Sequence, residues 1–133
     1  MKIYCLTDFK SAVDKLIKKK SYNTIEQQII DYYFCGKTID DVLSGARLNN
    51  STTEPYIKKR LNGAGGFRFY YLVKIEENSV YLMFVHPKSG SEGSENITDE
   101  SKAKIYKDLL NAIKTNNLLK VEEKKGKLYF TKL

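Results

Sequence analysis

The sequence predicts an α+β fold, in which an antiparallel meander sheet is preceded by two helices and followed by one helix and a β-hairpin. Segments with helical spacing of apolar residues lie before and after a central block, where β-prone runs alternate with turn residues. The chain has 133 residues, of which 41% are hydrophobic, and it contains neither a repeat nor a linker. We therefore expect one domain over residues 1–133 with a single core.

The first part of the chain predicts a short strand and two helices. Residues 2–7 are β-prone, and the apolar residues of 8–20 recur at helical spacing, opposite a face rich in lysine. Thr24 has capping-box spacing at the start of a second helix, which Gly36 ends. One or two further helical turns are expected before Gly45, and a polar loop follows.

The central block predicts three strands of an antiparallel meander, at residues 56–61, 67–75 and 80–86. The glycine-rich residues 62–66 favour a hairpin turn between the first two strands. The third run is continuously apolar, which is typical of a strand buried on both faces. A loop rich in glycine and serine is expected at residues 87–96.

The last part of the chain predicts a helix and a hairpin. Thr98 is a good N-cap, and two acidic residues follow in the first turn, where the helix dipole favours them. The expected packing face of this helix carries Ile105, Leu109, Ala112 and Ile113. Two β-prone runs around "KKG" predict a closing hairpin over 118–133.

The composition limits the classes of partner and compartment. A net charge of +7 and a pI near 9.3 favour an anionic partner, which means nucleic acid, an acidic protein or a membrane surface. Without an apolar span or a signal peptide, we expect a cytoplasmic protein without a membrane partner. Cys5 and Cys35 are expected to be small buried hydrophobes, and a disulfide between them stays open. With one histidine and no Cys/His cluster, we expect no metal and no cofactor.

A cationic cluster in the central block is the strongest functional signal. Strand alternation places Lys58 and Arg60 on one face and Lys59 on the other. On the next strand, alternation predicts a core face with Phe67, Phe69, Tyr71 and Val73, and an open face with Arg68, Tyr70, Leu72 and Lys74. Arg68 is then expected to meet the cations of the preceding strand across the hairpin.

Clustered cations beside an aromatic ring suit a polyanion whose bases can stack. Lys59, Tyr70 and Lys74 are therefore further candidates for RNA contacts. The alternative is an ordinary amphipathic hairpin with a solvated cationic face, and the residues alone do not decide between the two. A glycine-based phosphate cradle at 62–66 is a weak alternative to a turn, because a strand follows it instead of a helix.

His86 is the single histidine and stands at the end of the apolar run. It is either a polar surface residue or a group for proton transfer, because the ordinary pKa of histidine lies near neutrality. Lys88, two residues later, is a further candidate cation.

The string "KKRLNGAGGFRFYYLV", a turn, "VYLMFVHPKSG" and a helix resemble the core of the RelE/HigB-like toxins of bacterial type II toxin–antitoxin systems. That family has a K-x-[KR]-L strand, a Gly/Ser turn, a G-[YF]-R-x-x-Y strand and an apolar strand that ends near a lysine. The matching positions are Lys58, Arg60, Leu61, Gly66, Phe67, Arg68, Tyr71 and residues 80–88. The resemblance covers roughly residues 1–115, and the hairpin at 118–133 is expected to be an addition.

The resemblance implies a metal-independent endoribonuclease that cleaves mRNA, in many members on the ribosome, and that an antitoxin protein inhibits. The RNA 2′-OH attacks the adjacent phosphate, which requires a base, an acid and cations near the developing charge. By motif position, Arg68 would stabilise that charge, while Lys58 and Arg60 would bind phosphate and help to activate the 2′-OH. Lys88 would fill the basic position after the apolar strand, and His86 is one candidate for the acid.

The chain also departs from the family pattern. Ser89 follows Lys88 where some members have an arginine, and Tyr129 is the one candidate for a C-terminal tyrosine near the phosphate. The same fold hosts ParE-like toxins, which inhibit DNA gyrase without nuclease activity. A basic RNA-binding module without chemistry is a further alternative. The clustered cations favour RNA cleavage.

Overall fold

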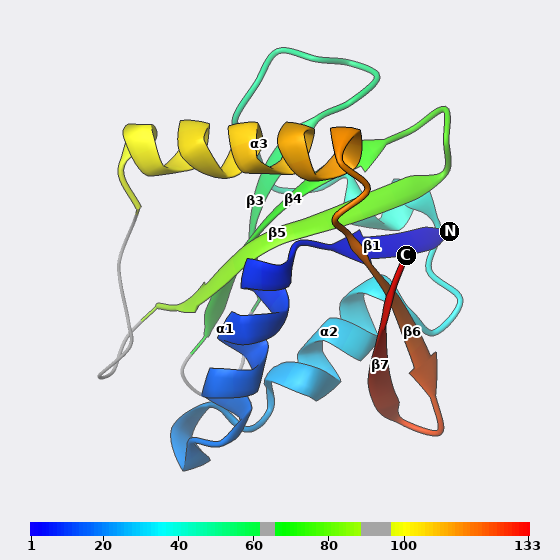
Figure 1. Cartoon of the computed structure of the whole chain (residues 1–133). Coiled ribbons are helices and arrows are strands. Elements are labelled where there is room, and N and C mark those ends of the chain that lie inside the picture. Colours follow the sequence, from blue (N-terminus) through cyan, green and yellow to red (C-terminus); the bar gives the residue numbers. More distant parts are fainter. Residues whose placement is uncertain (62–65, 89–96) are drawn as a thin grey trace.

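A seven-stranded sheet forms the centre of the computed structural model, which describes residues 1–61, 66–88 and 97–133 (Figure 1). The strand order across the sheet is β2-β3-β4-β5-β1-β6-β7. The strands are β1 (Lys2–Cys5), β2 (Ala46–Arg47), β3 (Tyr56–Leu61), β4 (Phe67–Lys74), β5 (Ser79–Pro87), β6 (Leu119–Lys124) and β7 (Lys127–Lys132). All neighbouring pairs are antiparallel except β1 with β5, which is parallel.

The predicted meander is confirmed as β3-β4-β5, and the predicted closing hairpin is confirmed as β6-β7. The two parts share one sheet because β1 lies between them, with Tyr4 opposite both Tyr81 of β5 and Lys120 of β6. The sequence did not predict this insertion. The predicted turn over 62–66 and the loop over 87–96 fall mostly outside the described residues.

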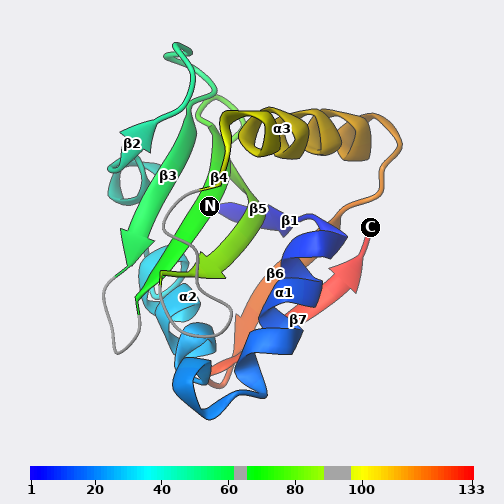
Figure 2. The same cartoon turned by 90° about the vertical axis from the view of Figure 1, so that its left-hand side faces the viewer.

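Helices cover both faces of the sheet (Figures 1 and 2). The helices are α1 (Thr7–Ile17), α2 (Ile25–Tyr33) and α3 (Asp99–Lys114), with 3-10 turns η1 (Lys20–Tyr22) and η2 (Ile39–Val42). α1 and α2 pack on one face, while α3 crosses the other. The predicted cap of α3 is confirmed, because the Thr98 hydroxyl accepts a hydrogen bond from the Ser101 amide at 3.1 Å. Thr24, however, makes no side-chain cap at the start of α2.

The second sheet face is at least partly exposed at Arg60 and Arg68, but the expectation of an open face was wrong for Tyr70 and Leu72. Tyr70 and Leu72 of β4 are each 0% exposed, because Leu109 and Ala112 of α3 pack in the same cluster. The core face predicted for β4 is confirmed, since Phe67, Phe69, Tyr71 and Val73 pack against α1 and α2. Both faces of β4 therefore stabilise the fold.

A β-bulge in β5 decides which side chains share a face near the end of that strand. Tyr70 pairs with Phe84, whereas the next residue, Tyr71, pairs with Leu82, so Met83 is the extra residue. Met83 and Phe84 both pack on the α3 side. After the bulge, successive side chains again point to opposite faces of the sheet. His86, two residues after Phe84, therefore lies on the α3 side as well.

The two cysteines occupy different environments and are both free thiols. Cys5 is buried as expected, and burial raises the pKa of its thiol to about 12. Cys35 is exposed, so the expectation of burial was wrong for this residue. In the described part of the chain, no helix combines the length and the apolar character that crossing a membrane requires.

Candidate anion-binding site

Two rows of paired residues bring the predicted cations together at one end of the meander. Arg60 of β3 pairs with Arg68 of β4, which pairs with His86 of β5. The neighbouring row contains Lys58 and Tyr70. Residues paired across strands share a face, so all five side chains belong to the α3 side of the sheet. Figure 2 shows that α3 crosses near the other end of β3 and β4, away from the Leu61 end of β3.

A surface hollow of about 410 Å³ lies at these cations. We call it the cationic hollow, and its lining residues are Gly45, Ala46, Lys58, Lys59, Arg60 and Arg68. β2 forms its rim, because Ala46 pairs with Lys58. Gly45 permits this close pairing, since a Cβ there would lie 2.7 Å from Ile57 Cγ2 and 2.8 Å from the Lys58 carbonyl oxygen. The sequence predicted Gly45 only as the end of a helical turn.

The electrostatics of the cationic hollow favour an anion. Like charges directly opposite each other on neighbouring strands are destabilising, and Arg60 lies opposite Arg68. The pKa of the Lys58 ammonium is lowered, first by partial burial and then by the positive charges of Lys102 and Arg68. An anion with oxygen acceptors would offset this mutual repulsion and accept charge-assisted hydrogen bonds from the arginines.

A buried Tyr70–His86 pair borders the cationic hollow. The Tyr70 hydroxyl lies 3.1 Å from His86 Nε2, and the rings stack with centroids 5.6 Å apart. His86 Nδ1 lies 2.9 Å from the Pro87 carbonyl oxygen, which only accepts hydrogen bonds. Nδ1 therefore carries the proton of a neutral imidazole, and the Tyr70 hydroxyl donates to Nε2. Burial, opposed by the Pro87 hydrogen bond and aided by the charges of Arg68 and Lys58, lowers the pKa of His86.

This pair changes the roles expected for its two members. Tyr70 was expected on an exposed face to stack on RNA, but it is 0% exposed and no base can reach its ring. Burial raises the pKa of Tyr70, so its hydroxyl keeps the proton that it donates. His86 lies within β5 and is 6% exposed, which excludes a surface residue. In the neutral ring, Nε2 accepts from Tyr70 and the Nδ1 proton is donated to the Pro87 carbonyl. The ring therefore has no proton directed at a leaving group.

The three remaining lysine candidates have different positions. Lys59 points to the face opposite Lys58 and Arg60, as predicted, and its Nζ lies 5.6 Å from the ring centroid of Tyr32 of α2. Lys74 is not brought to the site: it lies six residues from Arg68 along β4, roughly 20 Å away. Its ammonium is 3.5 Å from the Glu77 carboxylate. Lys88 stays near the cluster, because its amide donates to the carbonyl of Gly66, which directly precedes β4.

Tyr129, the candidate for a C-terminal tyrosine, is remote from the cationic hollow. It is 50% exposed on β7, which is four strand spacings, roughly 19 Å, from β4. Lys102 of α3 was not among the sequence candidates, although its charge acts on Lys58. No sequence signal identified it, because the approach of α3 to β3 depends on tertiary packing.

Among residues 1–61, 66–88 and 97–133, no three His, Cys, Asp or Glu side chains are grouped as metal ligands. Comparisons with protein-family models, curated proteins and solved structures find no match to this chain. The function is therefore inferred from the chemistry of the residues at the cationic hollow.

Proposed function

We propose that the chain is the toxin of a bacterial toxin–antitoxin pair, with a RelE-like fold, and that it cleaves mRNA at the cationic hollow. The observation that carries the proposal is the position of Arg60 directly opposite Arg68, with Lys58 on the same face. These are the residues at which the sequence resembles the RelE/HigB-like toxins. The proposed partners are mRNA, in a ribosome-bound or free form, and an antitoxin whose acidic segment covers the cationic hollow.

The proposed reaction needs no metal ion. The RNA 2′-oxygen attacks the adjacent phosphorus, the bond from phosphorus to the 5′-oxygen breaks, and the products carry a 2′,3′-cyclic phosphate and a 5′-hydroxyl. A base takes the proton from the 2′-OH, and an acid donates a proton to the leaving 5′-oxygen. Fixed cations stabilise the charge that develops on the phosphate oxygens.

Arg60 and Arg68 bind the non-bridging phosphate oxygens in this mechanism, because a guanidinium fits two oxygens at once. Lys58 is the base: its lowered pKa leaves a larger share of free amine than an ordinary lysine has at the same pH. The Lys88 ammonium is the acid. Its amide donates to the carbonyl of Gly66, which keeps this proton donor beside the start of β4, near Arg68. His86 and Tyr70 act as positioning residues that hold β4 and β5 in register.

Two rival functions make different use of the same surface. A ParE-like inhibitor of DNA gyrase shares the proposed fold but needs no base beside a phosphate site. A passive RNA-binding module needs the cations but does not need Lys58 with a lowered pKa. RNA cleavage uses both features, and for this reason we place it first.

The test is induced expression in a bacterial host, with growth and mRNA 5′ ends measured together. We expect growth arrest and new 5′ ends with the wild type, and neither with Arg68→Ala. Lys74→Ala is the matched control, because it removes a cation from the same strand far from the cationic hollow. Arrest without RNA cleavage would support the gyrase inhibitor, and salt-sensitive RNA binding without arrest would support the passive module.

A further inference from the structure

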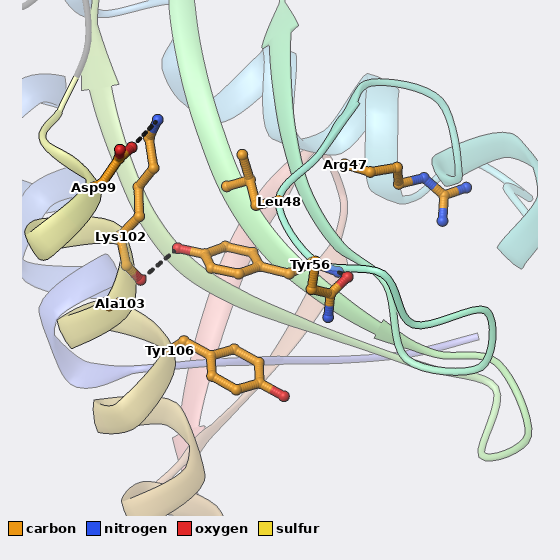
Figure 3. Close-up of a pocket in the computed structure, with 8 residues that line it drawn as sticks. Arg47, Leu48, Tyr56, Asp99, Lys102, Ala103 and Tyr106 are labelled. Carbon is orange, nitrogen blue, oxygen red and sulfur yellow. Dashed lines mark hydrogen bonds and ion pairs between the residues drawn. The ribbon is translucent and has the colours of Figure 1, made fainter.

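A second hollow, of about 490 Å³, adjoins the cationic hollow along β3. It lies between α3 and residues 47–49, and we call it the aromatic hollow (Figure 3). Tyr56 of β3 lies between the two sides, while Lys102, Ala103 and Tyr106 of α3 form one wall. Leu48 stands on the opposite wall.

Two tyrosine rings give the aromatic hollow its chemistry. Tyr56 and Tyr106 stack with centroids 5.6 Å apart and an interplanar angle of 19°. Tyr56 is 4% exposed, and its hydroxyl donates to the Lys102 carbonyl oxygen at 3.0 Å, which fixes the ring (Figure 3). Tyr106 is partly exposed and presents its ring to the hollow. Such a site suits a flat ligand with an apolar face.

The polar groups at the aromatic hollow are largely engaged by the protein itself. The Asn49 side-chain oxygen accepts from the Tyr56 amide at 2.9 Å, and its nitrogen donates to the Glu54 carbonyl oxygen at 3.1 Å. The Lys102 ammonium is 3.6 Å from the Asp99 carboxylate. Few groups are therefore available to read the hydrogen-bonding edge of a ligand, and binding would depend on ring stacking.

The two hollows are neighbours in three ways. Tyr56 and Lys58 stand two residues apart on the same face of β3, roughly 7 Å from each other. Ala46 lines the cationic hollow, and the next residue, Arg47, lines the aromatic hollow. The charge of Lys102 also contributes to the lowered pKa of Lys58, so α3 approaches the cationic hollow. The distance of roughly 7 Å between Tyr56 and Lys58 is comparable with the distance from a phosphate to the base of its own nucleotide.

We propose that the aromatic hollow binds one nucleobase of a single-stranded RNA whose phosphate lies in the cationic hollow. This inference rests on the proposed function and adds a subsite to it. Stacking accepts every base, and the two-ring purines offer a larger face for contact with the tyrosine ring than the pyrimidines do. The subsite therefore gives the enzyme a preference for a purine beside the bound phosphate, without strict sequence recognition.

The experiment measures binding of short adenine and pyrimidine oligonucleotides that lack the 2′-hydroxyl and so cannot be cleaved. We expect the wild type to bind the adenine oligonucleotide more tightly. Tyr106→Ala should weaken that binding roughly five- to hundredfold and remove the preference, as expected for one base stacked on an aromatic ring. Tyr106→Phe keeps the ring and should bind like the wild type. Tyr129→Ala, at an exposed tyrosine on β7, is the matched control.

A second variant guards against loss of folding in Tyr106→Ala. Ala103 is an exposed residue of α3 at the wall of the aromatic hollow, so Ala103→Leu narrows the hollow without removing a buried group. It should weaken binding of the adenine oligonucleotide in the same direction. Thermal unfolding of each variant establishes that the protein tested is folded.

The salt dependence separates the subsite from the phosphate site. Arg68→Ala should reduce the slope of log affinity against log salt by about one, whereas Tyr106→Ala should leave the slope unchanged. Affinity that depends on Arg68 but not on Tyr106 or Ala103 would overturn the base subsite and leave the proposed function standing. Failure of the wild type to bind either oligonucleotide would overturn the base subsite, whereas the growth and mRNA 5′-end experiment decides the proposed function.

Discussion

Arg60 and Arg68 lie directly opposite each other on the neighbouring strands β3 and β4. Two cations in this position repel each other, and cross-strand pairs of this kind change stability by about 0.2–1 kcal/mol. The repulsion between them is unfavourable for folding, and both arginines line the cationic hollow.

The first prediction separates stability from activity at Arg60. Arg60→Ala should leave the free energy of unfolding within about 0.5 kcal/mol of the wild type, or raise it slightly at low salt, because the repulsion from Arg68 is relieved. RNA cleavage should fall strongly, since a phosphate ligand is lost. Urea denaturation and a cleavage assay on the same preparation measure the two effects. A loss of stability well above 1 kcal/mol would make Arg60 a structural residue.

The second prediction concerns the base. If Lys58 takes the proton from the 2′-OH, cleavage should rise with pH along a limb whose midpoint lies below 10.5, because the pKa of Lys58 is lowered from that value. Lys58→Arg keeps the charge but cannot act as a base, so the rate should fall by about 10²–10⁴. The measurement is a pH–rate profile of both proteins. Wild-type activity and pH dependence in Lys58→Arg would assign the base elsewhere.

The third prediction uses the fact that His86 is the one histidine in the sequence, so its ring protons are readily assigned by NMR. Its titration midpoint should lie below 6.5 because of burial and the nearby charges of Arg68 and Lys58. Arg68→Ala removes one of these charges and should raise the midpoint. A wild-type midpoint at or above 6.5 would contradict the buried, neutral ring.

The lowered pKa of His86 also predicts how folding stability depends on pH. Between the lowered pKa of the folded state and 6.5, the unfolded chain binds more protons at His86 than the folded chain does. The contribution of the neutral ring is therefore fully present above 6.5 and is lost as pH falls toward the folded pKa. Urea denaturation across this range should show a steeper decline in the wild type than in His86→Gln. Parallel curves for the two proteins would show that His86 does not contribute to the pH dependence of the free energy of unfolding.

The fourth prediction concerns the rim of the cationic hollow. Gly45→Ala should destabilise the protein, because the new Cβ would lie 2.7 Å from Ile57 Cγ2 and 2.8 Å from the Lys58 carbonyl oxygen. Gly126→Ala is the matched control: this glycine also has a positive φ, of 77°, but nothing lies within 4 Å of the added Cβ. We expect Gly45→Ala to cost more than the control and to weaken RNA binding, since β2 must move away from Lys58. Equal effects of the two changes would mean that backbone strain alone matters.

Local pattern determined much of this structure. Alternation along β3 and β4 predicted that Lys58 and Arg60 share a face with Arg68, while Phe67, Phe69 and Tyr71 face the core. These relationships hold because strand geometry fixes the face of each side chain over a few residues, and a hairpin has one register that buries its apolar face. The helix order and the Thr98 cap were predictable for the same local reasons.

Tertiary structure decided the rest. Alternation placed Tyr70 beside Arg68 but could not show that α3 covers that part of the sheet and buries the ring. The bulge at Met83 set the face of His86, and the insertion of β1 joined the meander to the closing hairpin. Each of these features depends on contacts between segments far apart in the chain. The sequence by itself therefore determined the row of cations, and long-range packing determined that a buried Tyr70–His86 pair borders it and that α3 adds an aromatic hollow beside it.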